Sequence, residues 1–176
     1  GMPYAHVRII GNLPYYITTP ILMKLLEDGV AADSITVMMQ KEVAERMRAL
    51  PGTKAYGALS VAVQYYCEAE NVVTVPASCF VPQPKVTSAV VRMDRRAAPP
   101  ASVDDEKLFF RTVRAAFAQR RKTLSNALRS GFSELDRAAI ESAMEETGLP
   151  PAVRGETLSI AQFAALSNAL LRKFDK

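Results

Sequence analysis

The sequence predicts an α/β fold in its first half and a small all-α domain in its second half. Three observations support this prediction. Two short apolar runs, each followed by a helical pattern, occupy residues 6–50, which is the order of elements in a parallel α/β sheet. Two further strand-like runs are joined by a proline-rich loop. Beyond a linker at residues 95–102, every segment has helical periodicity.

The first elements are a strand and a helix. Residues 6–10 are rich in Val and Ile and alternate little, as expected of a strand buried on both faces of a parallel sheet. After a turn, we expect Thr19 to cap a helix that Pro20 opens and Gly29 ends. Residues 34–39 predict a second buried strand.

The middle of the chain contains two helical patterns and a hairpin. Residues 41–50 predict a helix, and residues 58–67 favour another, although their Val and Tyr content also allows a strand. Residues 72–75 and 89–93 predict two strands joined by a loop with three prolines. Because proline fixes the backbone φ angle, that loop should be rigid and should hold the isolated ring of Phe80 in place.

The second domain is predicted to be helical throughout. Acidic residues open its first helix, where the helix dipole favours negative charge. The expected helices span residues 104–118, 122–129, 134–147 and 160–173. We therefore divide the chain into domains at residues 3–98 and 99–176, with the boundary in the linker.

Composition excludes several classes of function. Of the 176 residues, 49% are hydrophobic and 23% charged, as in soluble globular proteins, and no apolar run is long enough to span a membrane. We therefore expect a cytoplasmic protein. Cys67 and Cys79 are not in a Cys-x-x-Cys pair and His6 is the only histidine. This argues against a metal site and against a Ser-His-Asp triad.

Basic residues are concentrated in one stretch of the second domain. From residue 107 to residue 129 there are seven basic side chains and no acidic one, although the net charge of the chain is only +4. A local positive field predicts a docking surface for a polyanion, and the alternative is a solvated helix face. The seven residues are Lys107, Arg111, Arg114, Arg120, Arg121, Lys122 and Arg129.

A polar turn, Asn12-Leu13-Pro14-Tyr15, follows the first strand, and ligands of α/β sheets bind at this end of the strands. The Asn12 oxygen and a neighbouring backbone carbonyl could hold both hydrogens of an adenine amine and direct its lone pair at the methyl group of a sulfonium cofactor. Positioning would then replace a general base. The alternative is an ordinary strand-to-helix turn in which Asn12 binds local backbone groups and Tyr15 packs.

Several sequence blocks together resemble the ribosomal RNA adenine dimethyltransferases, in particular the bacterial enzymes that act on 16S ribosomal RNA. The resemblance extends from Arg8 to about Phe174. The blocks include "GNLPYYITTPILMKLL", "VPASCFVPQPKVTSAVVRM" and "FFRTVRAAFAQRRKTLSNAL". The Asn-Leu-Pro-Tyr motif of the first and the Phe-x-Pro-x-Pro-x-Val motif of the second, Phe80 to Val86, make the resemblance highly specific.

The resemblance implies roles for individual residues. Asn12, Leu13, Pro14 and Tyr15 would bind the target adenine, with Asn12 also touching S-adenosylmethionine, and Phe80 would close the base pocket. Residues of the second domain and the loop would bind RNA: Lys85, Arg111, Arg114, Arg120, Arg121, Lys122 and Arg129. The fold implied is the C-terminal half, strands four to seven, of a Rossmann-like class I methyltransferase sheet.

The implied function is S-adenosylmethionine-dependent N6,N6-dimethylation of adjacent adenines near the 3′ end of 16S ribosomal RNA during small-subunit assembly. The family's Gly-rich loop and acidic cofactor ligands have no counterpart in this sequence, so we expect the chain alone to be inactive and to bind the cofactor weakly. The strand at Val7–Ile10 would then be a bare apolar edge, which predicts an edge-paired or swapped homodimer, or a fragment of a longer protein. Alternatives are a noncatalytic RNA- or ribosome-binding module and a resistance-type methyltransferase of 23S ribosomal RNA.

Overall fold

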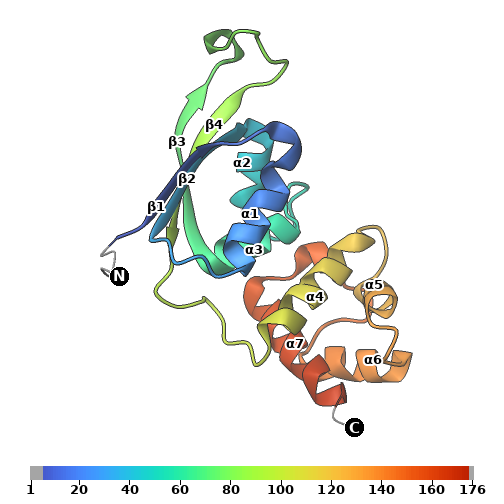
Figure 1. Ribbon diagram of the computed structural model, residues 1–176. Coiled ribbons are helices and arrows are strands. Elements are labelled where there is room, and N and C mark those ends of the chain that lie inside the picture. Colours follow the sequence, from blue (N-terminus) through green and yellow to red (C-terminus); the bar gives the residue numbers. More distant parts are fainter. Residues whose placement is uncertain (1–5, 175–176) are drawn as a thin grey trace. The chain divides into compact units, whose positions relative to one another are not determined.

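The computed structural model describes residues 6–174, which form two compact units (Figure 1). The sheet unit contains the residues up to 49 and residues 62–98. The helical unit contains residues 50–61 and the residues from 99 onward. The helical unit thus includes residues 50–61, which precede the linker. The sequence had placed these residues in the first domain.

A mixed four-stranded sheet is the centre of the sheet unit, with the strands in the order β1-β2-β4-β3. β1 and β2 are parallel, whereas β4 is antiparallel to both β2 and β3. The parallel pair and the hairpin predicted from the sequence are therefore both present. The strands are β1 (Arg8–Asn12), β2 (Ser34–Gln40), β3 (Cys67–Val75) and β4 (Ser88–Arg95).

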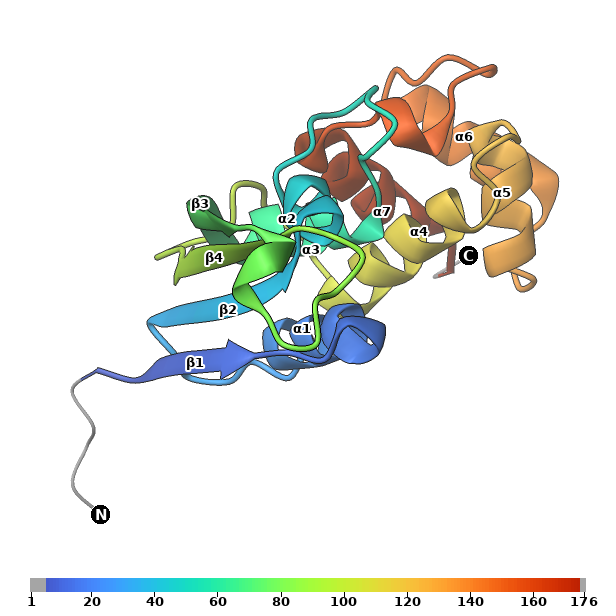
Figure 2. The same cartoon turned by 90° about the horizontal axis from the view of Figure 1, so that it is seen from above.

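One face of this sheet is packed against helices. Ile35, Val37 and Met39 point to the same face of β2 and are buried, with Met39 fully inaccessible. The helices α1 (Thr18–Glu27) and α2 (Lys41–Met47) and the C-terminal part of α3 (Ala58–Tyr66) lie along one side of the strands in Figure 2. The core of the unit is formed between these helices and the sheet.

β1 is an edge strand, and the expectation that the first strand is buried on both faces is wrong. Its residues alternate between exposed and half-buried, and Ile10 is 81% exposed. Within the described residues β1 pairs only with β2, from Arg8 opposite Ser34 to Asn12 opposite Met38. The apolar character of the strand is therefore not explained by its burial in this sheet.

The helix after the turn also differs from the prediction at its start. A short 3-10 helix, η1 (Tyr15–Ile17), precedes α1, so Thr19 is not the cap and Pro20 is the third helical residue. The end is as predicted, because Gly29 follows with φ of 66°, a left-handed conformation that favours glycine. Proline is tolerated at this position because the first-turn N–H groups have no intrahelical acceptor.

The third helix is one residue shorter than predicted and the strand after it is much longer. β3 begins directly at Cys67, whereas residues 72–75 were the expected strand. Most of β3 is exposed, so its length depends on antiparallel pairing with β4 rather than on burial. A register shift between Asn71 and Val73 interrupts that pairing.

Four helices build the helical unit, close to their predicted positions. Asp105 caps the first by accepting a hydrogen bond from the Leu108 backbone N–H at 2.9 Å, and Asp136 caps the third through Ala139 at 2.7 Å. The buried aromatic residues of the core include Phe109. The helices are α4 (Glu106–Ala118), α5 (Leu124–Gly131), α6 (Arg137–Glu146) and α7 (Ile160–Phe174), with the short 3-10 helix η3 (Gly155–Thr157) before α7.

The segment of residues 50–61 is anchored to this helical core. The Tyr56 side chain is 1% exposed, its hydroxyl donates to the Leu158 carbonyl at 2.8 Å, and its ring packs edge-on against Phe117. The Gly52 N–H donates to the Glu156 carbonyl at 2.7 Å. Across residues 6–174, no helix combines the length and apolarity that crossing a membrane would take.

Candidate functional site

The turn between β1 and α1 is held by backbone and hydroxyl hydrogen bonds. The Leu13 N–H donates to the Met38 carbonyl of the neighbouring strand at 3.2 Å. The Pro14 carbonyl accepts from the Ile17 N–H at 3.2 Å and from the Thr18 hydroxyl at 3.0 Å. Thr18 itself is 1% exposed. The backbone of the turn is therefore fixed from both sides before any ligand binds.

Asn12 ends β1 and presents its side chain at the C-terminal end of the strand. The residue is exposed, and its side-chain amide has no hydrogen-bond partner among residues 6–174. The alternative in which this amide binds local backbone groups therefore receives no support from the described contacts. An amide oxygen in this state is available to accept from a ligand.

Phe80 is supplied by the loop between β3 and β4. The 3-10 helix η2 (Ala77–Cys79) follows β3, and the Phe80 N–H donates to the Ala77 carbonyl at 3.2 Å. Phe80 is half-buried. The hairpin that carries this loop projects beyond the helices of the sheet unit in Figure 1.

The turn and the loop form one pocket of about 320 Å³. It brings together all five residues assigned to adenine binding from the sequence, although 65 positions separate Tyr15 from Phe80. Two prolines of the loop complete its wall. The lining residues are Asn12, Leu13, Pro14, Tyr15, Phe80, Pro82 and Pro84. An acceptor amide beside two aromatic rings and an apolar floor suits a flat base with an exocyclic amine.

Ser88 belongs to the support of this pocket and was not predicted. Its hydroxyl lies 2.5 Å from the Tyr15 hydroxyl, and its residue is fully buried. A serine at the start of a strand carries no sequence signal for such a role. The contact depends on strand pairing that only the fold establishes.

The basic residues of the helical unit divide into two groups by their contacts. The Arg111 guanidinium donates to the Gly131 carbonyl at 2.8 Å and to both Glu134 carboxylate oxygens at 2.8 Å, and it lies 4.4 Å from the centre of the Phe132 ring. Such contacts bind α4 to the end of α5. Arg111 is therefore engaged within the unit itself.

Arg120 is also engaged, whereas its neighbours are not. Its guanidinium pairs with Glu156 at 3.0 Å and donates to the Lys54 carbonyl at 3.0 Å. Arg121 and Lys122 are exposed, and their side chains have no hydrogen bond or ion pair to another described residue. Their charges are consequently open to a ligand.

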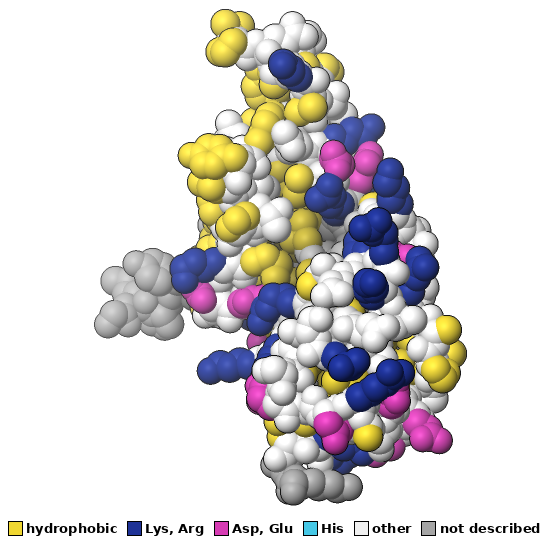
Figure 3. Space-filling model, turned by 90° about the vertical axis from the view of Figure 1, so that its right-hand side faces the viewer, with side chains coloured by type: hydrophobic (Ala, Val, Ile, Leu, Met, Phe, Trp, Pro, Cys, Tyr) yellow, Lys and Arg dark blue, Asp and Glu magenta, His cyan; other side chains and the backbone are white. Residues whose placement is uncertain are grey.

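The remaining predicted RNA-binding side chains lie on exposed positions. Arg129 on α5 and Lys85 in the β3–β4 loop form no side-chain pair within the described part of the chain, and Arg114 is exposed on α4. Several Lys and Arg side chains lie on the face of the molecule that Figure 3 shows. A shallow pocket of about 490 Å³ adds two basic residues that the sequence prediction did not include, Lys54 and Arg154, beside Arg121.

No three His, Cys, Asp or Glu side chains of the described residues are grouped to hold a metal ion. His6 contacts Asp33 at the surface, with Nδ1 and the carboxylate 3.2 Å apart.

Comparison with known proteins identifies the family. Residues 3–171 match the family described as ribosomal RNA adenine dimethylase. The chain belongs to this family. The resemblance inferred from the sequence blocks is thus confirmed, and the adenine dimethylase match covers both units.

Relatives of this adenine dimethylase chain carry a more specific name. A protein of Geobacillus thermodenitrificans called ribosomal RNA small subunit methyltransferase A is 54% identical over 168 residues. That alignment covers 94% of this chain and 57% of the relative. A Bacillus cereus protein of the same name is 55% identical over 168 residues, again with 57% of the relative covered. The chain spans somewhat more than half the length of the curated relatives it matches.

Solved structures agree on the fold of the adenine dimethylase chain. A dimethyladenosine transferase from Plasmodium falciparum has a TM-score of 0.74 at 22% identity, with 99% of this chain and 69% of that chain covered. The 23S ribosomal RNA methyltransferase ErmE has a TM-score of 0.62 at 25% identity, covering 97% and 68%. The first of these supports the fold alone.

Proposed function

We propose that this chain recognises the target base in S-adenosylmethionine-dependent N6,N6-dimethylation of adjacent adenines near the 3′ end of 16S ribosomal RNA. One observation carries the proposal: the amide of Asn12, which has no hydrogen-bond partner among residues 6–174, lies in the same pocket as Tyr15 and Phe80. The small-subunit name of the relatives favours 16S ribosomal RNA as the substrate. The cellular setting proposed is the cytoplasm during assembly of the small ribosomal subunit.

The chemistry proposed for the pocket is positioning of a weak nucleophile. An exocyclic adenine amine reacts poorly because its lone pair is delocalised into the ring. The Asn12 oxygen and a carbonyl of the adjacent backbone accept its two hydrogens, which favours a tetrahedral nitrogen with a directed lone pair. S-adenosylmethionine, when bound, supplies the electrophilic methyl group. The methylated nitrogen would carry a positive charge and lose one proton to solvent water after transfer, so no strong base is needed in the pocket.

The aromatic side chains hold the base. Tyr15 offers its ring from the turn, and Phe80 closes the pocket from the β3–β4 loop. Stacking on these aromatic rings replaces the base stacking that an extruded base loses when it leaves the RNA. Pro14 keeps the backbone between Asn12 and Tyr15 rigid.

Asn12 is also the one residue of this chain that we assign to the cofactor. An exposed amide without a partner among the described residues fits that role. No G-x-G motif occurs among the eight glycines of the sequence. We therefore propose that residues 1–176 alone bind S-adenosylmethionine weakly and transfer no methyl group.

The helical unit is proposed to dock on the small ribosomal subunit. Arg121, Lys122 and Arg129 are the first candidates for phosphate contacts, because their charges have no described partner. Arg114, Arg120 and Lys85 are further candidates. Arg111 is also proposed to bind RNA, and the alternative is that it only stabilises the helical unit through Glu134 and Phe132.

A methyl-transfer assay tests the pocket. The full product of the encoding gene is mixed with labelled S-adenosylmethionine and unmethylated small ribosomal subunits. Asn12→Ala should reduce transfer by at least about 100-fold, because the amine loses its principal acceptor. Asn71→Ala, which removes an exposed amide from β3, is the control and should retain transfer. Transfer by Asn12→Ala at the wild-type rate would refute the proposed role.

Binding to small subunits, measured at several salt concentrations, tests the docking surface. Replacing Arg121 and Lys122 by Ala should weaken particle binding and reduce the slope of log K against log salt by about one for each phosphate that is no longer neutralised. Arg111→Ala should leave that slope nearly unchanged if its internal contacts dominate. To test the substrate, unmethylated large subunits are offered beside the small ones. Methylation of 23S rather than 16S ribosomal RNA, read by primer extension, would favour the resistance-type enzyme.

A further inference from the structure

Ser88 occupies a fixed position on β4, between the two neighbouring strands β2 and β3. It is the first residue of β4, opposite Gln40 of β2 and Val75 of β3, and it is completely buried. Because both neighbouring strands hold its backbone, the hydroxyl has little freedom to move. Ser88 does not line the candidate pocket, so it does not touch a bound base itself.

The Ser88 hydroxyl contacts the candidate stacking residue. Its Oγ atom lies 2.5 Å from the Tyr15 hydroxyl oxygen, and either hydroxyl can donate the hydrogen bond. Tyr15 is half-buried and borders the pocket. The phenol end of the ring is therefore tied to the sheet, while the ring itself remains available to a ligand.

The contact connects the two walls of the pocket. Tyr15 comes from the β1–α1 turn, and Phe80 from the loop that ends at Ser88. The end of this loop is also fixed to the start of α2, because the Lys41 N–H donates to the Thr87 carbonyl at 3.0 Å. One hydrogen bond thus joins the turn to the base of the loop that carries the opposite ring.

We propose that Ser88 is a positioning residue that fixes the Tyr15 ring at the orientation and separation from Phe80 that a single adenine requires. The inference rests on the proposed function of the pocket and extends it to a buried side chain outside it. Without the bond, the Tyr15 side chain can swing about its Cα–Cβ bond, and a base stacked on the ring loses its alignment. Misalignment of a reacting group lowers the rate of transfer more than it lowers affinity for the RNA as a whole, most of which comes from phosphate contacts.

Four variants of the full gene product test this role. Ser88→Ala and Tyr15→Phe each remove one hydroxyl of the pair, and the double variant removes both. Ser34→Ala removes a buried hydroxyl from the start of β2 and is the matched control. Thermal unfolding of each variant checks that the fold persists, and the steady-state rate of methyl transfer gives kcat and KM.

Ser88→Ala and Tyr15→Phe should each lower kcat about three- to tenfold with little change in KM, as expected for removal of one hydrogen bond. The double variant should be no slower than the slower single variant, because both remove the same interaction. Ser34→Ala should keep the wild-type kcat. Multiplicative decreases in the double variant, or an unchanged kcat in Ser88→Ala, would overturn the inference.

A measurement without RNA separates this inference from the proposed function. With labelled tyrosine, the NMR signals of the Tyr15 ring should shift in Ser88→Ala, because the phenol loses its hydrogen bond and the side chain samples further rotamers about its Cα–Cβ bond. The same signals should be unchanged in Ser34→Ala. Unchanged Tyr15 signals in Ser88→Ala would overturn the positioning role. If the signals change but the wild-type protein transfers no methyl group, the hydrogen bond stands and the proposed function fails.

Discussion

At the scale of single residues, contacts rather than residue types separate candidate ligands from structural side chains. Arg111 and Arg121 both belong to the basic stretch recognised in the sequence. Arg111 is engaged with Glu134 and Phe132, whereas the Arg121 side chain has no pair within the described residues. The same contrast holds for Asn12, whose amide is unpartnered among residues 6–174, and Tyr15, whose hydroxyl is bonded.

The two cysteines should differ in reactivity because Cys67 is buried and Cys79 is exposed. Burial raises the pKa of the Cys67 thiol to about 11, whereas Cys79 is exposed. At pH 8 only about one Cys67 thiol in a thousand is then ionised, and the thiolate is the reactive form. Titration with a chromogenic disulfide reagent should detect one thiol in the native chain and two after denaturation.

The variant Cys79→Ser provides the control for this titration. It should leave no rapidly reacting thiol in the native state and one after denaturation. Rapid reaction of two thiols in the native wild-type chain would mean that the end of α3 and the start of β3 open more readily than their burial indicates.

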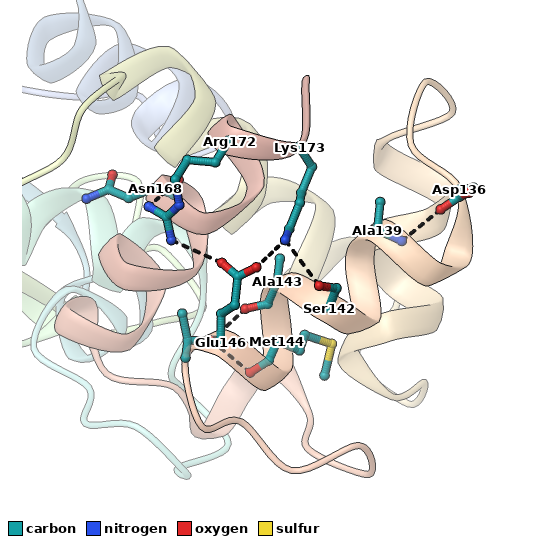
Figure 4. A network of polar contacts seen from close by, with 10 residues as sticks. Asp136, Ala139, Ser142, Ala143, Met144, Glu146, Asn168, Arg172 and Lys173 are labelled. Atoms are coloured by element: carbon teal, nitrogen blue, oxygen red, sulfur yellow. Dashed lines mark hydrogen bonds and ion pairs between the residues drawn. The ribbon is translucent and has the colours of Figure 1, made fainter. Parts of the chain in front are cut away.

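At the scale of elements, a carboxylate on α6 binds two cations in the last turn of α7 (Figure 4). Glu146 pairs with Arg172 at 3.2 Å and also accepts from Lys173. The Lys173 ammonium group donates further to the Ser142 hydroxyl at 3.1 Å, and its side chain is only 9% exposed. The cations lie where the helix dipole favours positive charge. The cluster therefore holds the final helix against α6.

This cluster predicts how stability depends on pH. Hydrogen bonds from Lys173 and then from Arg172 lower the pKa of Glu146 below its ordinary value of 4.5. A carboxylate with a lowered pKa stabilises the fold fully above that ordinary value, and the contribution disappears as the pH falls towards the lower value of the folded state. Unfolding by urea between about pH 3 and pH 7 measures the effect.

Glu146→Gln should flatten the acid side of this stability profile. Glu145→Gln, at the preceding exposed position of α6, is the control and should keep the wild-type slope. Equal slopes for Glu146→Gln and the wild-type protein would show that the cluster does not contribute to folding.

At the scale of the whole molecule, the edge of the sheet predicts association. β1 has one strand neighbour within the described residues, and Ile10 on it is 81% exposed. Unpaired backbone groups beside exposed apolar side chains favour pairing with another strand. We expect residues 1–176 to form an edge-paired or swapped dimer, with a mass in light scattering that rises with concentration.

A charge on that edge should oppose association. Ile10→Lys places a solvated cation on β1 and should shift the chain towards the monomer. Val81→Lys is the control, since Val81 is fully exposed in the β3–β4 loop, away from the strand edge. A monodisperse monomer of the wild-type chain at every concentration would contradict the prediction.

Much of the architecture is encoded locally. The helices of the second unit could be placed because their apolar periodicity, and for α4 its acidic first turn, are independent of distant contacts. Gly29 marked a helix end because its left-handed backbone is a local property. The predicted start of α1 was wrong because a 3-10 turn forms there instead of the first helical turn. The predicted length of β3 was too short because antiparallel pairing with β4 extends the strand beyond what local propensity indicates.

The sequence by itself determined the family, the helical second half and the residues Asn12, Tyr15 and Phe80 of the candidate pocket. Their residue types and order along the chain are enough for that inference. Only the tertiary structure decided that Phe80 meets the turn in one pocket, that Ser88 holds Tyr15 and that Arg111 is bound internally. These facts depend on strand register and helix packing, which bring together side chains tens of residues apart and which no local pattern specifies.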